Sequence, residues 1–261
     1  MVTDNMCDAT TASSKMAKVI KSPRGITICV YCGSSTGNDP AHLQTARDLA
    51  RLMAARGANL GKFTNLEPKP DFINNLLTIT MVYGGGTVGL MGQVAQTLVS
   101  LSGPGSVHGI IPEALVKFER DNTYSSVASG NMPLPEEATY GRTTIVKDMH
   151  TRKRMMAEEV IAGGPGSGFV ALVGGYGTVE EVLEVAAWVQ LGIHQRGVCL
   201  ININGFWDGI LGWIRRAAEE RFIRPANAGI VEEASTPAEA IDKLAADEVP
   251  DSILHLEWDG I

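Results

Sequence analysis

The chain has 261 residues, of which 44% are hydrophobic and 20% are charged. This balance is typical of a folded globular protein and excludes a largely disordered one. A net charge of −7 argues against a general nucleic-acid or anionic-membrane binder. The sequence has no run of about 18 apolar residues, so no membrane span is expected. Four cysteines are too few for a disulfide scaffold, and we therefore expect a cytoplasmic protein.

Short runs rich in β-branched residues alternate with helical patterns along the chain. Strands are predicted at 26–31, 78–83, 106–111, 143–146, 168–173 and 198–203. Helices are predicted at 39–56, 89–100, 148–161, 178–191, 206–221 and 237–246. Strands that alternate with helices pair in parallel, and parallel sheets are covered on both faces. The pattern therefore predicts an α/β fold: a single doubly wound, Rossmann-like domain with a mainly parallel sheet and helices on both faces.

The ends of the chain and two internal stretches differ in character from this alternation. Residues 1–24 are polar and rich in Ser and Thr, and they predict a disordered leader without a secretory signal. The domain is expected over 25–249, followed by a C-terminal tail at 250–261. Stretches at about 58–77 and 117–140 are interpreted as insertions, the second as a surface loop. No linker predicts a second domain.

Three glycine-rich turns follow predicted strands and precede predicted helices, at 33–37, 84–89 and 174–178. Glycine lets backbone N–H groups approach an anion, and a helix N-terminus adds partial positive charge. A phosphate site is therefore expected at this sheet edge, although such turns also use glycine for its positive φ alone. The second turn matches G-x-G-x-x-G, but no acidic residue follows at the distance that NAD binding requires.

Charged residues are expected around the third turn: two glutamates follow it in the chain, and two cations of an earlier helix are expected near it in the fold. Thr178 and Glu181 match a helix capping box, which would be a purely structural role. Glu180 and Glu181 would repel a nearby phosphate unless cations offset them. Arg152 and Lys153 lie in the first turns of a predicted helix, where cations oppose the helix dipole. An anionic ligand or a carboxylate partner explains that placement, so Arg152 is predicted to line the site.

The remaining reactive residue types give no independent site. Cys29 and Cys32 are spaced C-x-x-C, but on a strand this spacing points the two thiols to opposite faces. They are interpreted as buried hydrophobic residues and not as a redox pair. The five histidines show no metal-ligand spacing, and no metal site is predicted.

Taken together, the motifs resemble the Lonely Guy (LOG) family of cytokinin-activating phosphoribohydrolases, once described as lysine decarboxylases. The family's G-G-x-G-T-x-x-E is similar to residues 174–181, and its M-x-x-R-K to residues 149–153. Its C-G-S-S is similar to residues 32–35, and its Y-G-G-G-x-x-G-L-M-G to residues 83–92. Residues 222–225 also resemble the family, which usually has Pro where this chain has Val173.

The resemblance implies hydrolysis of the N-glycosidic bond of a nucleoside 5′-monophosphate. The substrate would be an N6-substituted AMP, a cytokinin nucleotide, or AMP itself, and the products a free base and ribose 5-phosphate. Arg152 and Glu181 are the implied catalytic residues, with Glu180 as the near alternative to Glu181. The implied substrate-binding residues are Gly174, Gly175, Tyr176, Gly177, Thr178, Glu180, Lys153, Met149, Ser34, Ser35 and Gly85. No metal or other cofactor is implied.

Two other functions remain as alternatives. The same loops could form a non-catalytic module that binds AMP. Decarboxylation with pyridoxal phosphate would need a Schiff-base lysine, for which Lys147 and Lys153 are the candidates. The family resemblance also implies a homodimer or a larger homo-oligomer, with no nucleic-acid or membrane partner.

Overall fold

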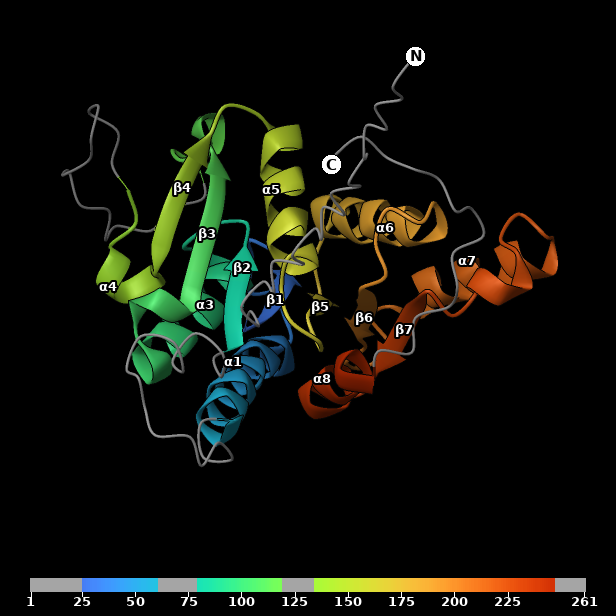
Figure 1. Cartoon of the computed structure of the whole chain (residues 1–261), viewed down its shortest axis with the longest axis horizontal. Coiled ribbons are helices and arrows are strands. Elements are labelled where there is room, and N and C mark those ends of the chain that lie inside the picture. The colour runs from blue at the N-terminus through green and yellow to red at the C-terminus, as the bar shows by residue number, and fades with distance from the viewer. Residues whose placement is uncertain (1–24, 61–78, 119–133, 247–261) are drawn as a thin grey trace, which may run out of the picture.

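The computed structural model describes residues 25–60, 79–118 and 134–246. The expected leader at 1–24, the tail at 250–261 and most of both insertions lie outside these residues. Figure 1 shows the arrangement of the described elements. The strands are β1 (Ile26–Tyr31), β2 (Ile79–Tyr83), β3 (Val107–Pro112), β4 (Arg142–Val146), β5 (Gly168–Ala171), β6 (Gly197–Ile201) and β7 (Val231–Ala234). They form one sheet in the order β4-β3-β2-β1-β5-β6-β7, and every pairing is parallel. The predicted fold class is confirmed.

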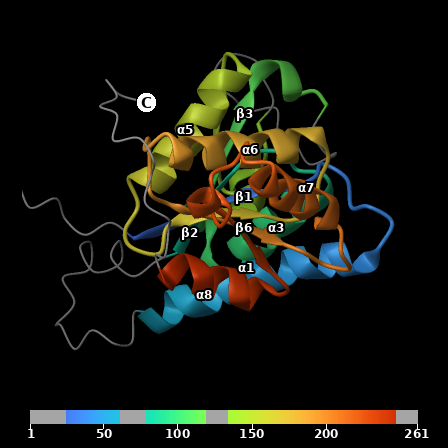
Figure 2. The ribbon, with the colours of Figure 1, turned by 90° about the vertical axis from the view of Figure 1, so that its right-hand side faces the viewer.

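Helices cover both faces of this sheet. They are α1 (Pro40–Leu60), α3 (Gly89–Ser102), α4 (Glu137–Tyr140), α5 (Met149–Ile161), α6 (Tyr176–Gln190), α7 (Asp208–Glu219) and α8 (Pro237–Ala246). Short 3₁₀ turns occur at Pro104–Ser106, Glu113–Leu115 and Pro225–Asn227. Figure 2 shows α1 and α8 on one side of the sheet and α5 and α6 on the other.

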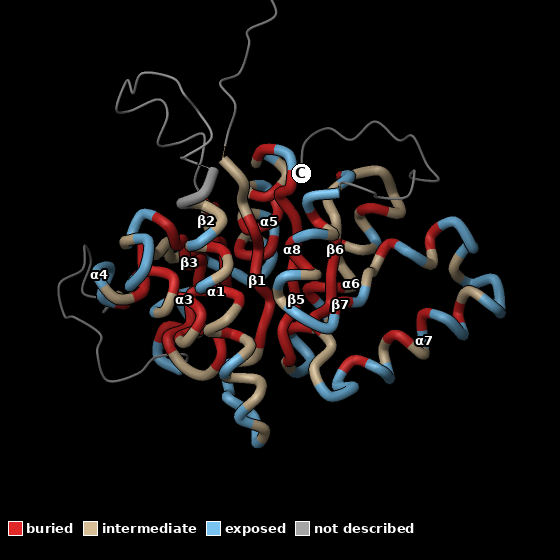
Figure 3. The backbone as a smooth tube through the Cα atoms, turned by 90° about the horizontal axis from the view of Figure 1, so that it is seen from below, coloured by how far each residue is buried: buried red, intermediate tan, exposed pale blue. Residues whose placement is uncertain are grey.

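The central strand β1 supplies side chains to two separate hydrophobic cores. Ile28 and Val30 join the core beneath α1, α3 and α8, whereas Cys29 and Tyr31 join the core beneath α5 and α6. Successive side chains of a strand point to opposite faces, so a continuous apolar run is buried on both. Figure 3 shows the resulting buried centre of the sheet. Cys29 and Cys32 lie in different cores, as predicted, and both are free thiols.

The structure adds two elements that the sequence did not predict, β7 and α4, and it extends α1. The edge strand β7 was not predicted, because Glu232 and Glu233 interrupt its apolar pattern, and an edge strand needs only one buried face. Residues 58–60, expected to begin an insertion, complete α1. The second expected insertion contains the single-turn helix α4, which is too short to leave a periodic pattern.

The strand order changes direction between β1 and β5, where a ligand-binding crevice is expected. Chain connections leave the sheet centre in opposite directions there, since β2 follows β1 on one side and β6 follows β5 on the other. Ligands of open α/β sheets bind at such a switch point, at the carboxyl ends of the strands. The first and third glycine turns follow β1 and β5 and therefore meet at this position.

The turn between α6 and β6 holds the C-terminal end of α5. Arg196 donates hydrogen bonds to three carbonyls there, those of Ile161 (3.0 Å), Gly163 (2.6 Å) and Gly164 (3.2 Å). These oxygens have no partner within the helix, so the guanidinium satisfies them. The buried His194 accepts a hydrogen bond at Nδ1 from the Arg196 backbone N–H at 3.0 Å and packs on Phe169.

We predict that His194 makes the fold sensitive to acid. Burial disfavours the charged imidazole and lowers the pKa of His194 to about 4. The unfolded chain, with a pKa of about 6.5, binds the proton first, so stability falls as the pH drops from about 6.5 towards 4. Between pH 7 and pH 4.5 this group alone should cost about 2 kcal/mol of unfolding free energy.

Urea unfolding of wild type and His194→Gln at the two pH values measures this term. The wild type should lose about 2 kcal/mol more than the variant on going from pH 7 to pH 4.5. Equal losses would show that His194 is protonated in the folded state.

Candidate active site

The loop after β1 is joined by backbone hydrogen bonds to both neighbouring loops of the crevice. The Gly33 N–H donates to the Val173 carbonyl at 3.0 Å, and the Leu90 N–H donates to the Gly33 carbonyl at 3.2 Å. Gly89 has a φ of +60°, and a Cβ there would lie 2.3 Å from the carbonyl carbon of Ser34. Glycine is therefore required at this contact. The three glycine turns thus form one connected wall.

Helix α6 begins at this wall, earlier than the sequence predicts. Gly175 is the N-cap residue, and no side chain caps the helix. Thr178 is consequently the third helical residue, and the predicted capping box of Thr178 and Glu181 is wrong. The Thr178 hydroxyl instead lies against Gly174, where an added Cβ would be 2.1 Å from Oγ1. The helix N-terminus is therefore left without a side-chain cap, and it faces the crevice with its amide groups.

Space for a ligand lies beside this helix start. A Cβ added at Gly175 or Gly177 would meet no atom within 4 Å. The side chain of Tyr176, between them, is 97% exposed. An open N-terminus with backbone N–H groups and a helix dipole favours an anion such as phosphate.

Arg152 of α5 enters the crevice from the neighbouring helix. Its side chain is only 8% exposed, and Nη2 lies 3.5 Å from Oε1 of Glu181, which is equally buried. Nη1 donates to the sulfur of Met149 at 3.8 Å, and Nε has no hydrogen-bond partner. A buried guanidinium ordinarily has strong partners for its donors. This one leaves hydrogen-bonding capacity unused within the described residues, which is the reason to consider a ligand as its further partner.

Gly84 makes room for that guanidinium at the end of β2. An added Cβ would lie 1.8 Å from Nη2 of Arg152. The second glycine turn therefore serves the site through Gly84, a residue that the sequence prediction missed. The predicted Gly85 has a φ of +77° and packs against Ile111, where a Cβ would lie 2.9 Å from the Ile111 Cβ. Gly85 thus shapes the loop.

Lys153 is held by two carboxylates of α6. Its ammonium group donates hydrogen bonds to Glu180 and, at 3.0 Å, to Oε1 of Glu184. Burial lowers the pKa of Lys153, but these two hydrogen bonds outweigh that effect and the pKa lies above its usual value. Glu184 was missed by the sequence prediction, although its spacing of four residues from Glu180 places both on one helix face.

Arg152 and Lys153 lie near the N-terminus of α5, as predicted. Asp148 caps the helix by accepting the Thr151 N–H at 2.8 Å. Met149 is 40% exposed at the rim of the crevice, and Ser34 and Ser35 are exposed on the loop after β1. The structure thus brings the predicted residues of all three turns and of α5 to one sheet edge.

The lysines do not fit a pyridoxal phosphate enzyme. A Schiff-base lysine needs an unprotonated amine, but Lys153 is a fully paired ammonium ion with a raised pKa. Lys147 is exposed at the surface. Within residues 25–60, 79–118 and 134–246, no group of three His, Cys, Asp or Glu residues could hold a metal ion. In the same residues no helix is long and apolar enough to cross a membrane.

The fold and the site define a class: a Rossmann-like protein in which glycine turns, an uncapped helix N-terminus and a buried Arg–Glu pair meet at the carboxyl ends of the strands. A family model described as "possible lysine decarboxylase" matches residues 91–244. A cytokinin riboside 5′-monophosphate phosphoribohydrolase of Arabidopsis thaliana is 37% identical over 219 residues, covering 84% of this chain and 77% of the relative. The chain belongs to this family, the LOG family of phosphoribohydrolases.

Two further proteins extend the comparison. A bifunctional cytokinin biosynthesis protein of Fusarium pseudograminearum is 48% identical over 224 residues, which are 86% of this chain but only 40% of that protein. The molybdenum cofactor binding protein of Rippkaea orientalis shares the fold, with a TM-score of 0.51 at 17% identity over 85% of this chain and 97% of that one. At that identity the likeness concerns the fold alone.

We predict that Gly84→Ala weakens nucleotide binding by displacing Arg152. The new methyl group would overlap the guanidinium, which must then shift from its place beside Glu181. Titration calorimetry with AMP should show at least a tenfold loss of affinity. Gly209→Ala is the matched control, because a Cβ there meets no atom within 4 Å. Unchanged AMP affinity in a folded Gly84→Ala variant would contradict this position of Arg152.

Proposed function

We propose that the chain hydrolyses the N-glycosidic bond of nucleoside 5′-monophosphates, with N6-substituted AMP as the preferred substrate. The products are a free adenine-type base and ribose 5-phosphate. One observation carries the proposal. Arg152, with Nε unpartnered, lies 3.5 Å from Glu181 in a crevice walled by glycine turns. The name of the Arabidopsis thaliana relative, a cytokinin riboside 5′-monophosphate phosphoribohydrolase, supports the same reaction.

The phosphate of the substrate is assigned to the start of α6. Gly174, Gly175, Gly177 and Thr178 would hold it through backbone N–H groups and the Thr178 hydroxyl. The open space at Gly175 and Gly177 supports this placement. Tyr176, Met149, Ser34 and Ser35 would surround the rest of the nucleotide at the exposed rim.

The chemistry follows from the charges of the two buried residues. As the bond from ribose C1′ to the base breaks, its electron pair goes to the base and positive charge grows on the ribose. Glu181 stabilises that positive charge and accepts a proton from the attacking water. Arg152 stabilises the negative charge on the departing base. The water oxygen bonds to C1′, and the base takes up a proton, so the step needs no redox partner.

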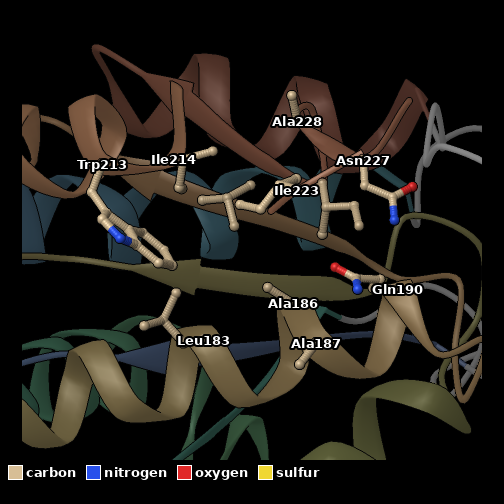
Figure 4. Close-up of a pocket in the computed structure, with 11 residues that line it drawn as sticks. Leu183, Ala186, Ala187, Gln190, Trp213, Ile214, Ile223, Asn227 and Ala228 are labelled. Atoms are coloured by element: carbon tan, nitrogen blue, oxygen red, sulfur yellow. The ribbon is translucent and has the colours of Figure 1, made fainter. Parts of the chain in front are cut away.

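We further propose that the chain works in the cytoplasm as a homodimer or larger homo-oligomer. Cys29, Cys32 and Cys199 are buried free thiols, which suits a reducing compartment. For assembly, the candidate surface is an apolar groove of about 190 Å³ between α6 and α7, shown in Figure 4. We assign a second copy of the chain to it.

The groove has the features of an uncovered interface. Trp213 of α7 faces Leu183 of α6 across it and is 52% exposed (Figure 4). Phe222, just beyond α7, is 86% exposed, and Asn227 has a buried amide without a partner. Exposed aromatic side chains beside an apolar groove mark association surfaces. Since α6 also carries Glu181, this assignment would put the interface near the active site, as the family resemblance implies.

A chromatographic assay of base release tests the proposed reaction. Wild type should release base and ribose 5-phosphate from N6-isopentenyl-AMP, but not from the nucleoside or from GMP. Glu181→Gln and Arg152→Ala should each lower kcat/KM by at least about 100-fold. The exposed Glu219→Gln should retain wild-type activity, as it lies on α7 away from the crevice.

Other outcomes separate the alternatives. Cleavage of AMP without cleavage of N6-isopentenyl-AMP would keep the reaction and reject the cytokinin nucleotide. Tight binding of AMP with no release of base would establish the binding module and overturn the roles of Glu181 and Arg152.

We predict that Trp213→Glu dissociates the oligomer, because a carboxylate in the apolar groove cannot be desolvated without cost. Light scattering after size exclusion should give wild type a multiple of 27.8 kDa and the variant 27.8 kDa. Arg216→Ala, also on α7 and exposed, is the control and should assemble like wild type. A wild type that is monomeric at micromolar concentration would refute the assignment.

A further inference from the structure

The two carboxylates that hold Lys153 differ in how far they are shielded from water. The Lys153 side chain is 9% exposed, that of Glu184 is 25% exposed and that of Glu180 is 54% exposed. An ion pair with a largely exposed carboxylate is weakened by water and by salt, whereas a shielded pair is not. Glu184 is therefore the better-shielded of the two partners of the buried ammonium group.

This ion-pair cluster lies next to the catalytic pair. Arg152 and Lys153 are consecutive on α5, while Glu181 lies between Glu180 and Glu184 on α6. Both cations of α5 thus pair with carboxylates of α6, and the two helices run at a steep angle to each other (Figure 1). A shift of one helix along the other would separate both pairs together.

We propose that Glu184 is a positioning residue, which anchors Lys153 and thereby fixes α5 against α6 with Arg152 facing Glu181. The inference rests on the proposed function for its catalytic readout. It assigns Lys153 and Glu180, expected to bind substrate, to the same anchor. Lys153 offsets the charge of one of its two carboxylate partners, so the cluster of Lys153, Glu180 and Glu184 keeps a net charge of −1.

The surrounding titratable groups leave Lys153 dependent on these carboxylates. On β1, Cys29 and Tyr31 are buried, and burial raises the pKa of each well above its usual value, so both are neutral. On α6, Glu181 faces Arg152. On α5, Arg154 is directed to Glu158 at 3.7 Å on the exposed side. Glu180 and Glu184 therefore supply the negative charge that compensates Lys153.

The effect of removing Glu184 has a definite sign. Burial lowers the pKa of Lys153, and the hydrogen bonds that its ammonium group donates to Glu180 and Glu184 raise the pKa by more. Without the Glu184 charge, less opposes the effect of burial, so the pKa of Lys153 falls and the residue loses its proton at a lower pH. A neutral amine no longer forms the ion pair with Glu180, so the anchor fails at alkaline pH first.

The test compares Glu184→Gln with Glu158→Gln, which removes the same charge from the exposed side of α5. Glu184→Gln should lower kcat for N6-isopentenyl-AMP by at least tenfold at pH 8, with a smaller change in KM. The alkaline limb of its pH–rate profile should move to lower pH. Glu158→Gln should match wild type in both respects. A folded Glu184→Gln variant with wild-type kcat and pH profile would overturn the proposal.

Two further measurements separate positioning from loss of stability and from failure of the proposed reaction. If Glu184 acts through Lys153, then Lys153→Met/Glu184→Gln should be no slower than Lys153→Met alone. Additive losses would overturn the proposal. NMR titration of the Lys153 side chain should show a lower pKa in Glu184→Gln than in wild type. This shift is independent of activity, so its absence would refute the anchor, whereas a wild type that releases no base would refute the proposed reaction.

Discussion

The site depends on one constraint: two cationic side chains near the N-terminus of α5 are buried and need compensating negative charge. Arg152 and Lys153 are both buried, and an uncompensated buried charge costs several kcal/mol. Carboxylates of α6 compensate them, but unequally. Lys153 is fully paired, whereas Arg152 keeps an unpartnered Nε and a 3.5 Å separation from Glu181. That difference makes one cation structural and leaves the other free to act on a ligand.

The fold places this pair where a phosphate can also bind. The change of direction between β1 and β5 opens the crevice, and the glycine turns let three loops meet there without side chains between them. Because α6 starts at Gly175, its N-terminus faces the same space. One bound nucleotide would then have its phosphate at the helix start and its ribose beside Glu181, which is the arrangement that the proposed hydrolysis requires.

Much of this arrangement could be predicted from the sequence, and the rest depends on contacts between distant segments. The apolar runs and glycine turns define six strands and the parallel sheet, since burial on both faces leaves a continuous pattern. β7 could not be predicted in this way because its two glutamates interrupt that pattern. The helical start of α6 was misplaced because Thr178 matches a cap in the sequence, while the fold uses its hydroxyl against Gly174. Gly84 and Glu184 are recognisable only once Arg152 and Lys153 are in place.

A crystal structure of Glu181→Gln with AMP would show directly whether the nucleotide binds between the glycine turns and the Arg152–Glu181 pair. We expect the phosphate on the backbone N–H groups at the start of α6, the Arg152 guanidinium within hydrogen-bond distance of the nucleotide, and residue 181 beside the ribose C1′. A nucleotide bound elsewhere, or one that makes no hydrogen bond with Arg152, would refute the proposed site.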